Sequence, residues 1–291
     1  MLKKESKTMN DVKKINYLVL IEAVYSNPNG DPDNDNAPRV DPDTGYGIIT
    51  NQCLNRKVRN QIMLRCADKA GYDIYIQNDV VLNEKNAEAY KNLDIDKKAK
   101  KSDKMSVQSA KEFMLQKYFD VRAFGAVMST GDYSAGRVTG AVQTSFATSI
   151  NPITIQEISL TRQAITNDER AGNENEMGRK YVVPYGLYAF HVSVSAVQAK
   201  KNFFTEEDLK NYETALINMF ENDDSSVRNG MSVRAVYKFT HEHELGNAPA
   251  WKLYDLIKIE SLKEYPRRFA DFHIIVDEAN LPKGVSLSQL I

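Results

Sequence analysis

Residues 15–25 form an apolar run, INYLVLIEAVY, which is followed abruptly by a polar, proline-rich stretch, NPNGDPD (27–33). β-Branched and aromatic residues favour strands, so this run predicts a buried strand. Residues 27–47 are rich in Asp, Pro and Gly and predict a long irregular loop. A helix carrying basic residues is expected next. A strand, a wide loop and a basic helix together suit a surface that holds a polyanion.

The composition is typical of a soluble globular protein. The chain has 291 residues, 42% hydrophobic and 26% charged, enough for one large domain or two ordinary ones. No apolar run approaches the roughly 20 residues that span a bilayer, and the N-terminus lacks an apolar signal segment, so we expect a cytoplasmic protein without a membrane partner. Cys53 and Cys66 are expected to be reduced core residues. With a net charge of −1, nucleic-acid binding would depend on local basic patches.

Residues 50–66 predict the helix that follows the loop. Leu54, Val58 and Ile62 recur at helical spacing and form one apolar stripe. Arg56 and Arg59 lie off this stripe, so we expect a basic face turned outward.

The remaining chain predicts a mixed α+β fold. One or two short strands are expected at 72–82, and 167–176 is expected to be the tip of a long hairpin or loop. Further helices are expected at 106–119 and 205–221, and strands at 181–197, 231–240 and 271–277. This order suits an α+β sandwich of ferredoxin or RRM type. Such sheets often carry single-stranded RNA on one face.

Two clusters, one of aspartates and one of histidines, raise the question of a metal site. Asp31, Asp33 and Asp35 resemble the start of a calcium loop, but the Gly and Glu that such a loop needs are missing. Asx turns are the better interpretation, with a bound divalent ion as the alternative. His241 and His243 form a two-ligand pattern without an evident third ligand, and a surface strand end is favoured. There is no catalytic triad and no phosphate-cradling loop, so neither a metal, a cofactor nor a catalytic residue is predicted.

The basic residues form a clearer pattern in the sequence than the acidic and histidine clusters do. Phe124 and Tyr133 lie among these basic residues and are candidates for stacking on bases. Four glycines in 122–146 would permit close backbone approach. Together they favour binding of RNA or single-stranded DNA. The basic residues are Arg56, Lys57, Arg59, Arg122, Arg137, Arg162, Arg179 and Lys180.

Six long motifs, in this order along the chain, resemble those of one known protein family. They are NPNGDPDNDNAPRVDPDTGYG (27–47), NRKVRN (55–60), FDVRAFGAVM (119–128), GRVTGAVQTSFATSINP (136–152), SLTRQAI (159–165) and MGRKYVVPYGLY (177–188). From about residue 15 to 277 the chain resembles the backbone subunit of the CRISPR interference complex Cascade, the Cas7-type RAMP family. The NPNGDPD and MGRKYVVPYGLY motifs most resemble those of the type I-C branch.

The resemblance implies a single RAMP-type domain over 15–277, with a modified RRM palm at about 15–66 and 181–277. It further implies a finger insertion at about 67–157, a thumb hairpin at about 158–180, and tails at 1–14 and 278–291. Family copies polymerise along the spacer of a CRISPR guide RNA and present it for pairing with target DNA. Other partners implied are the guide-processing RAMP subunit and the large subunit.

The resemblance also implies residue roles. Asn55, Arg56, Lys57 and Arg59 would contact guide phosphates. The palm and its glycine-rich loop would contribute Arg122, Phe124, Gly125, Gly136, Arg137 and Gly140. The thumb would contribute Met177 as a wedge, with Arg162, Arg179 and Lys180 at its roots. Type I family members are not the nuclease. The alternative is a metal-dependent ribonuclease of the RAMP superfamily that uses Asp31, Asp33 and His241 or His243.

Overall fold

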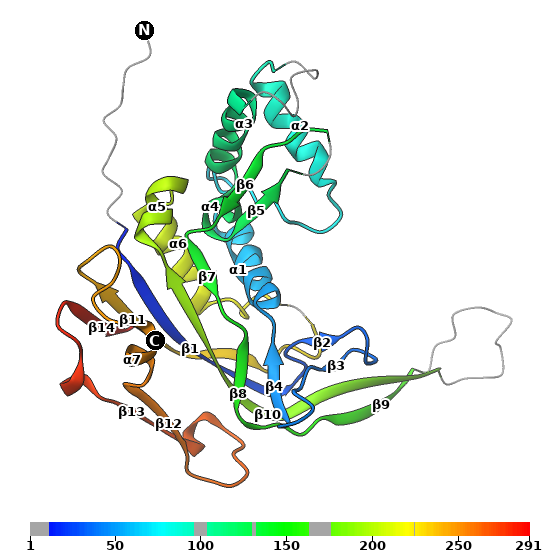
Figure 1. Cartoon of the computed structure of the whole chain (residues 1–291). Coiled ribbons are helices and arrows are strands. Elements are labelled where there is room, and N and C mark those ends of the chain that lie inside the picture. The colour runs from blue at the N-terminus through cyan, green and yellow to red at the C-terminus, as the bar shows by residue number, and fades with distance from the viewer. Residues whose placement is uncertain (1–11, 96–103, 130–131, 163–175, 224) are drawn as a thin grey trace, which may run out of the picture.

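The computed structural model describes residues 12–95, 104–129, 132–162, 176–223 and 225–291 (Figure 1). Its centre is an antiparallel sheet in the order β14-β11-β1-β10-β8-β4, in which β7 and β9 also pair with β10. The strands are β1 (Ile15–Ser26), β4 (Tyr46–Ile49), β7 (Val142–Thr144), β8 (Ala147–Pro152), β9 (Gln156–Arg162), β10 (Glu176–Val194), β11 (Met231–His241) and β14 (Val285–Gln289).

Strand β1 lies at the centre of this sheet, as its apolar sequence predicts. It pairs with β10 from Ile15↔Val194 to Ser26↔Val183, and with β11 from Ile15↔Thr240 onward. Tyr17, Val19 and Ile21 face one core cluster, and Leu18 and Leu20 face another. Because both faces are buried, apolar residues run continuously instead of alternating with polar ones.

Two helices cover the first face. They are α1 (Asn51–Arg65) and α6 (Glu206–Ile217), with the short α5 (Ala196–Asn202) before α6. Their apolar stripes meet in one cluster, in which Leu54 and Ile62 of α1 accompany Tyr212 and Leu216 of α6. Both helices begin at a threonine cap of the kind that favours helix starts: Thr50 accepts from the Cys53 N–H, and Thr205 forms a capping box with Asp208.

The second face of the sheet is covered as well. Helix α7 (Ala250–Tyr254) and the hairpin of β12 (Ile257–Ser261) and β13 (Phe272–Val276) lie over it. Leu253, Ile257 and Phe272 join Leu18 and Leu20 in its core cluster. The sheet face that an RRM would offer to single-stranded RNA is therefore buried here. An RNA would have to bind elsewhere on the molecule.

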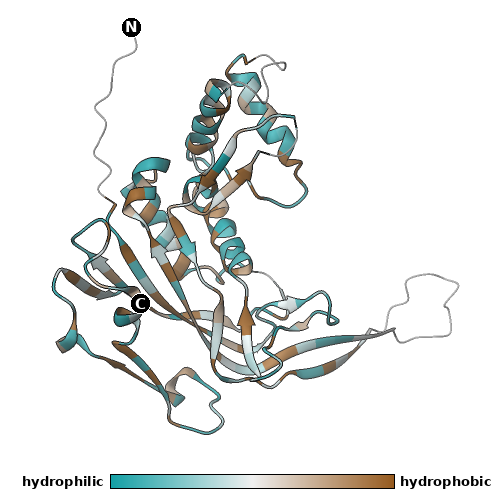
Figure 2. Cartoon of the chain, in the orientation of Figure 1, coloured by the Kyte–Doolittle hydropathy of each residue, from teal (hydrophilic) through white to brown (hydrophobic). Residues whose placement is uncertain are grey.

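An insertion forms a separate lobe beside the end of α1 (Figure 1). It comprises α2 (Leu82–Asn92), α3 (Lys104–Lys117), α4 (Phe119–Ala123) and the hairpin of β5 (Gly125–Met128) and β6 (Gly136–Thr139). In Figure 2 brown stretches follow the central strands, whereas α2 and α3 show teal and brown along each helix, as helices with one buried face do. Tyr75, Ala89 and Met114 belong to the core of this lobe.

The strands expected at 72–82 do not form. Asp73 makes only an isolated bridge with Tyr118, and α2 begins at Leu82. The reason is that the carboxylate of Asp120 accepts the N–H groups of Tyr75 and Ile76, at 2.7 and 3.1 Å. A side chain thus satisfies the donors that a neighbouring strand would otherwise satisfy.

Strands β9 and β10 continue beyond the sheet as a long arm (Figure 1). Their register runs from Val182↔Gln156 to Glu176↔Arg162. The tip predicted at 167–176 lies almost wholly outside the described residues. The Asp-rich loop at the foot of the arm contains the short pair β2 (Gly30–Asp31) and β3 (Ala37–Pro38).

The C-terminal segment 278–291 is not the expected tail. It contains β14, which pairs with β11 from His241↔Val285 to Tyr237↔Gln289 and forms an edge of the main sheet. Two 3₁₀ turns, Phe269–Asp271 and Glu278–Asn280, complete the C-terminal part. In the part of the chain that the structure describes, no helix is long and apolar enough to cross a membrane.

Candidate nucleic-acid interface

A cavity of about 390 Å³ opens beside the first half of α1. It brings together residues that are far apart in the sequence: Asn55, Arg56 and Arg59 of α1 lie with Phe124 and Gly125 of the insertion. Its lining is completed by Asn51, Gln52, Ile76, Val142, Gln143 and Thr144. The sequence did not predict Asn51, Gln52, Gln143 or Thr144 as site residues. Isolated amide and hydroxyl side chains form no motif that would indicate a binding site.

Arg59 is buried, not on an outward basic face as expected. It is 7% exposed, its Nε donates to Asp120 Oδ2 at 2.8 Å, and its guanidinium lies over the Phe124 ring, 4.9 Å from the centroid. Within the described ranges, its terminal nitrogens have no hydrogen-bond partner. One edge of the guanidinium is thus fixed, and the other remains available in the cavity.

Arg56 lies half-buried beside Arg59 in the same cavity. Burial lowers the pKa of its guanidinium, and the positive charge of Arg59 lowers it further. Among the residues that the structure describes, no carboxylate forms an ion pair with Arg56. Two like charges therefore share a partly desolvated hollow, and an anion placed between them would relieve both the repulsion and the loss of solvation.

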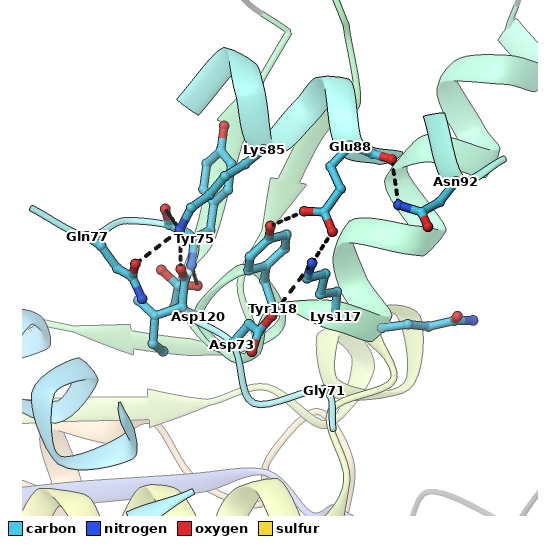
Figure 3. A network of polar contacts seen from close by, with 12 residues as sticks. Gly71, Asp73, Tyr75, Gln77, Lys85, Glu88, Asn92, Lys117, Tyr118 and Asp120 are labelled. Carbon is cyan, nitrogen blue, oxygen red and sulfur yellow. Dashed lines mark hydrogen bonds and ion pairs between the residues drawn. The ribbon is translucent and has the colours of Figure 1, made fainter. Parts of the chain in front are cut away.

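Asp120, the hydrogen-bond partner of Arg59, belongs to a polar region that also contains Lys85, Glu88 and Lys117 (Figure 3). Asp120 is 1% exposed and accepts from Arg59 and from two backbone N–H groups. Lys85 donates to the carbonyls of Ile74 and Tyr75, at 2.6 and 3.1 Å. Lys117 bridges Glu88 and Asp73 farther along. The cavity wall is therefore tied to the insertion lobe by charged hydrogen bonds, which give it a defined shape.

Lys57 and Arg122 are not placed to meet a ligand. Lys57 is 6% exposed and pairs with Asp223 at 2.6 Å. Arg122 is 5% exposed, forms a two-point pair with Asp208 at 2.7 and 3.2 Å, and donates to the carbonyls of Gly71 and Leu115. The predicted RNA contacts of both side chains conflict with these internal partners.

Gly125 and Gly140 of the insertion allow two backbone segments of this chain to pack closely against each other. A Cβ on Gly140 would lie 2.3 Å from the Ala123 carbonyl oxygen and 2.5 Å from the Gly125 nitrogen, and Gly125 has a φ of +81°. Both residues thus permit the β5–β6 hairpin to pack against α4. The glycines were expected to allow the backbone to approach RNA, whereas here they allow it to approach another part of the chain. Gly136, also at positive φ, begins β6. Arg137 is exposed on β6, opposite Val127.

The remaining predicted cations lie on the arm. Arg179 is exposed and pairs with Glu157 at 3.3 Å, and Lys180 donates to Ser226. Both line a second hollow, of about 240 Å³, with Asn27 and Asp35 of the Asp-rich loop. Arg162, the partner of Glu176, and Met177, the partner of Thr161, lie near the far end of the β9–β10 pairing, and their side chains lie outside the described residues. The arm residues and the α1 cavity therefore form two separate groups.

The proposed ribonuclease pairing of Asp31 with His241 is excluded by the register of the sheet. His241 follows Thr240, the partner of Ile15, whereas Asp31 follows the other end of β1. A strand of 12 residues separates these ends by about 36 Å. Asp31 instead pairs with Arg39 at 3.2 Å. No group of three metal-ligating side chains occurs in the described parts of the chain.

His241 is also not the surface residue that was expected. It is 1% exposed, its Nδ1 accepts from the Asn247 N–H at 2.8 Å, and its Nε2 lies 3.1 Å from Asn16 Oδ1. Since Nδ1 accepts, Nε2 must carry the proton and donate, which defines a neutral imidazole. Burial, and secondarily the charge of Lys14, lowers the pKa of this ring.

This burial predicts that stability falls as the pH falls below about 6.5, the ordinary histidine pKa. Burial also lowers the pKa of His191. The unfolded chain therefore binds protons before the folded chain does, and each histidine lowers the free energy of unfolding by at most about 1.4 kcal/mol per pH unit. Urea unfolding between about pH 7.5 and 5.5 tests this. His241→Gln should give a shallower slope, and equal slopes would contradict the role of His241.

Comparison with known proteins assigns the chain to a family. The family model described as CRISPR-associated protein Cas7 matches residues 13–277. The chain belongs to the Cas7 family. It is also similar to a CRISPR-associated protein Cas7 from Haloferax volcanii, at 25% identity over 296 residues, covering 94% of this chain and 83% of the relative.

The chain is also similar to chains in solved structures. A chain of a CRISPR RNA-guided surveillance complex, pre-nicking, is similar with a TM-score of 0.52 and 14% identity, covering 79% of this chain and 78% of that one. A second CRISPR RNA-guided surveillance complex gives a TM-score of 0.49 and 14% identity, over 82% and 74% of the two chains. At such identity, the first likeness shows a common fold.

Proposed function

We propose that this Cas7-family chain is a non-catalytic backbone subunit of a type I-C Cascade complex, which binds CRISPR guide RNA along its spacer. The observation that carries the proposal is the pair Arg56 and Arg59 in one cavity. Among the described residues Arg56 has no ion-pair partner, and Arg59 uses only its Nε edge for Asp120, so its terminal nitrogens remain available. A phosphodiester supplies the missing negative charge, and arginine matches phosphate geometry well.

The connectivity supports an RRM-like palm. In the order β11-β1-β10-β8, α1 lies in the connection from β1 to β8, and α5 and α6 lie in the connection from β10 to β11. This is the β-α-β-β-α-β arrangement of ferredoxin-like folds. The lobe around α2 and α3 then corresponds to the fingers, and the arm to the thumb, with Met177 as its wedge. Arg179 and Lys180 lie on the part of the arm nearer the sheet, and Arg162 lies at the far end of the described β9–β10 pairing, not at the root that was expected.

Backbone contacts explain how one subunit accepts every spacer. Phosphate contacts position a nucleic acid without reading its sequence. The net charge of −1 allows copies to lie against one another, since strongly basic subunits would repel each other. Copies would follow the guide as a helical filament in the cytoplasm, with the guide-processing RAMP subunit and the large subunit as further partners. Target DNA would pair with the exposed guide bases.

Arg56→Ala is expected to weaken RNA binding by about tenfold, the loss of one charged hydrogen-bonding group. The plot of log affinity against log salt concentration should become less steep, by about the contribution of one phosphate contact. The change should be equal for different spacer sequences. Fluorescence anisotropy with two unrelated spacer RNAs over a salt series measures both quantities.

Arg65→Ala is the matched control for Arg56→Ala. Arg65 lies in the last turn of the same helix, is exposed, and donates to Gln61 outside the cavity. Its loss should leave the salt slope unchanged. Equal effects of the two substitutions would show that α1 contributes only general charge. Magnesium-dependent cleavage of the bound RNA would overturn the non-catalytic part of the proposal.

A further inference from the structure

We propose that the α1 cavity recognises the ribose 2′-hydroxyl of a guide nucleotide through Asn51 and thereby selects RNA over DNA. This inference rests on the proposed function, because it assigns a second role to the site that would bind the phosphate. The chemical class of ligand is a single ribonucleotide unit, bound by its phosphate and by its sugar.

The first observation is an unpaired acceptor. Asn51 Oδ1 is buried and has no hydrogen-bond partner among the residues that the structure describes. Asn51 is the first residue of α1, directly after the cap Thr50, and it lines the cavity together with Arg56 and Arg59. Buried polar atoms in proteins are nearly always paired, so this oxygen calls for a donor from outside the chain.

The second observation is the mixed character of the groups that remain free. Asn55 Oδ1 already accepts from Thr144 Oγ1 at 2.9 Å, and Gln143 Nε2 donates to the Gly140 carbonyl at 3.1 Å. These bonds orient both amides, so Asn55 retains its NH₂ group as a donor and Gln143 retains its carbonyl oxygen as an acceptor. The cavity thus offers cationic donors and neutral acceptors side by side.

Few ligands satisfy both kinds of group. A DNA phosphodiester or a protein carboxylate supplies an anion for the arginines but no hydroxyl beside it. A ribonucleotide supplies the anion together with a 2′-hydroxyl, which donates as well as accepts and is the group that separates RNA from DNA. Arg59, more than nine-tenths buried and fixed by Asp120, gives the phosphate a defined position. In the proposed arrangement, the sugar of the same nucleotide lies at the first turn of α1, where Asn51 lines the cavity.

The test compares three probes of equal length: oligouridine, oligodeoxyuridine and 2′-fluoro-oligouridine. The deoxy probe lacks the hydroxyl, whereas the fluoro probe keeps an RNA-like sugar but donates no hydrogen bond. Wild-type protein is expected to bind both analogues about three- to tenfold more weakly than oligouridine, the effect of one hydrogen bond. Asn51→Ala should bind all three probes with similar affinity.

Asn51→Asp is the matched variant. It keeps an acceptor for the 2′-hydroxyl but adds a negative charge beside the phosphate, so the affinities for all probes should fall while the preference for oligouridine remains. Both variants suit the first turn of a helix and should fold. Discrimination that persists in Asn51→Ala, or wild-type discrimination against the deoxy probe alone, would overturn the inference. Wild-type protein that binds none of the probes would instead overturn the proposed function.

Discussion

Asp120→Ala is expected to lower the free energy of unfolding by about 3–5 kcal/mol, the cost of leaving a buried charge without its partner. Asp120 is 1% exposed and accepts from Arg59 Nε at 2.8 Å and from the N–H groups of Tyr75 and Ile76 at 2.7 and 3.1 Å. Alanine would strand a guanidinium and two backbone donors at once, in a site where solvent has little access.

Urea unfolding followed by circular dichroism measures this effect. The matched control is Asp68→Ala, an exposed carboxylate in the turn after α1, for which a change within about 0.5 kcal/mol is expected. Asp120→Asn should cost less than alanine, because the amide oxygen still accepts hydrogen bonds while the charge is lost. If Asp120→Ala were as mild as the control, Arg59 would have another anion or access to water in the folded protein.

Arg122→Met is expected to destabilise the fold by a similar amount, about 3–5 kcal/mol. Methionine keeps an unbranched apolar stem but removes the guanidinium and its charge. Asp208, whose side chain is 3% exposed, would lose its two-point partner, and the carbonyls of Gly71 and Leu115 would lose their donor. Because Arg122 joins α4 to the first turn of α6, the loss affects the junction between the insertion and the sheet-covering helices.

A double-mutant cycle isolates this ion pair. Asp208→Asn, combined with Arg122→Met, should cost less than the sum of the two single changes, since the second substitution no longer strands a charge. Arg137→Met is the control, because Arg137 is exposed on β6; its effect should stay within about 0.5 kcal/mol. Additive single effects would mean that Arg122 and Asp208 stabilise the fold independently.

Several elements could be predicted from the sequence because their signals are local. The stripes of α1 and α6, the caps Thr50 and Thr205, and the buried strand β1 are each defined within a few residues of chain. The family resemblance predicted RNA contacts for residues near 55–59 and near 124, and the structure places Asn55, Arg56, Arg59 and Phe124 around one cavity beside α1; their RNA contacts stay a prediction.

Such local signals could not predict which arginines are free to bind a ligand and which are paired inside the protein. Helix spacing places Arg56 and Arg59 on similar faces, yet Arg59 pairs with a carboxylate 61 residues away and Arg122 with one 86 residues away. The same long-range carboxylate prevented strands at 72–82, by accepting the N–H groups of Tyr75 and Ile76. The segment expected as a tail became β14 because the edge of β11 offered unpaired backbone groups.

The sequence by itself therefore determined that 15–25 is a buried strand and that the segments of α1 and α6 are helices with one apolar stripe each, because periodicity and capping act over one or two turns. Only the tertiary structure decided that both faces of the sheet are covered, that Lys57 and Arg122 are internal, and that Arg56, Arg59 and Asn51 line one cavity. The physical reason is that charge pairing and desolvation depend on distances in space, and folding sets these distances between residues whose separation along the chain carries no signal.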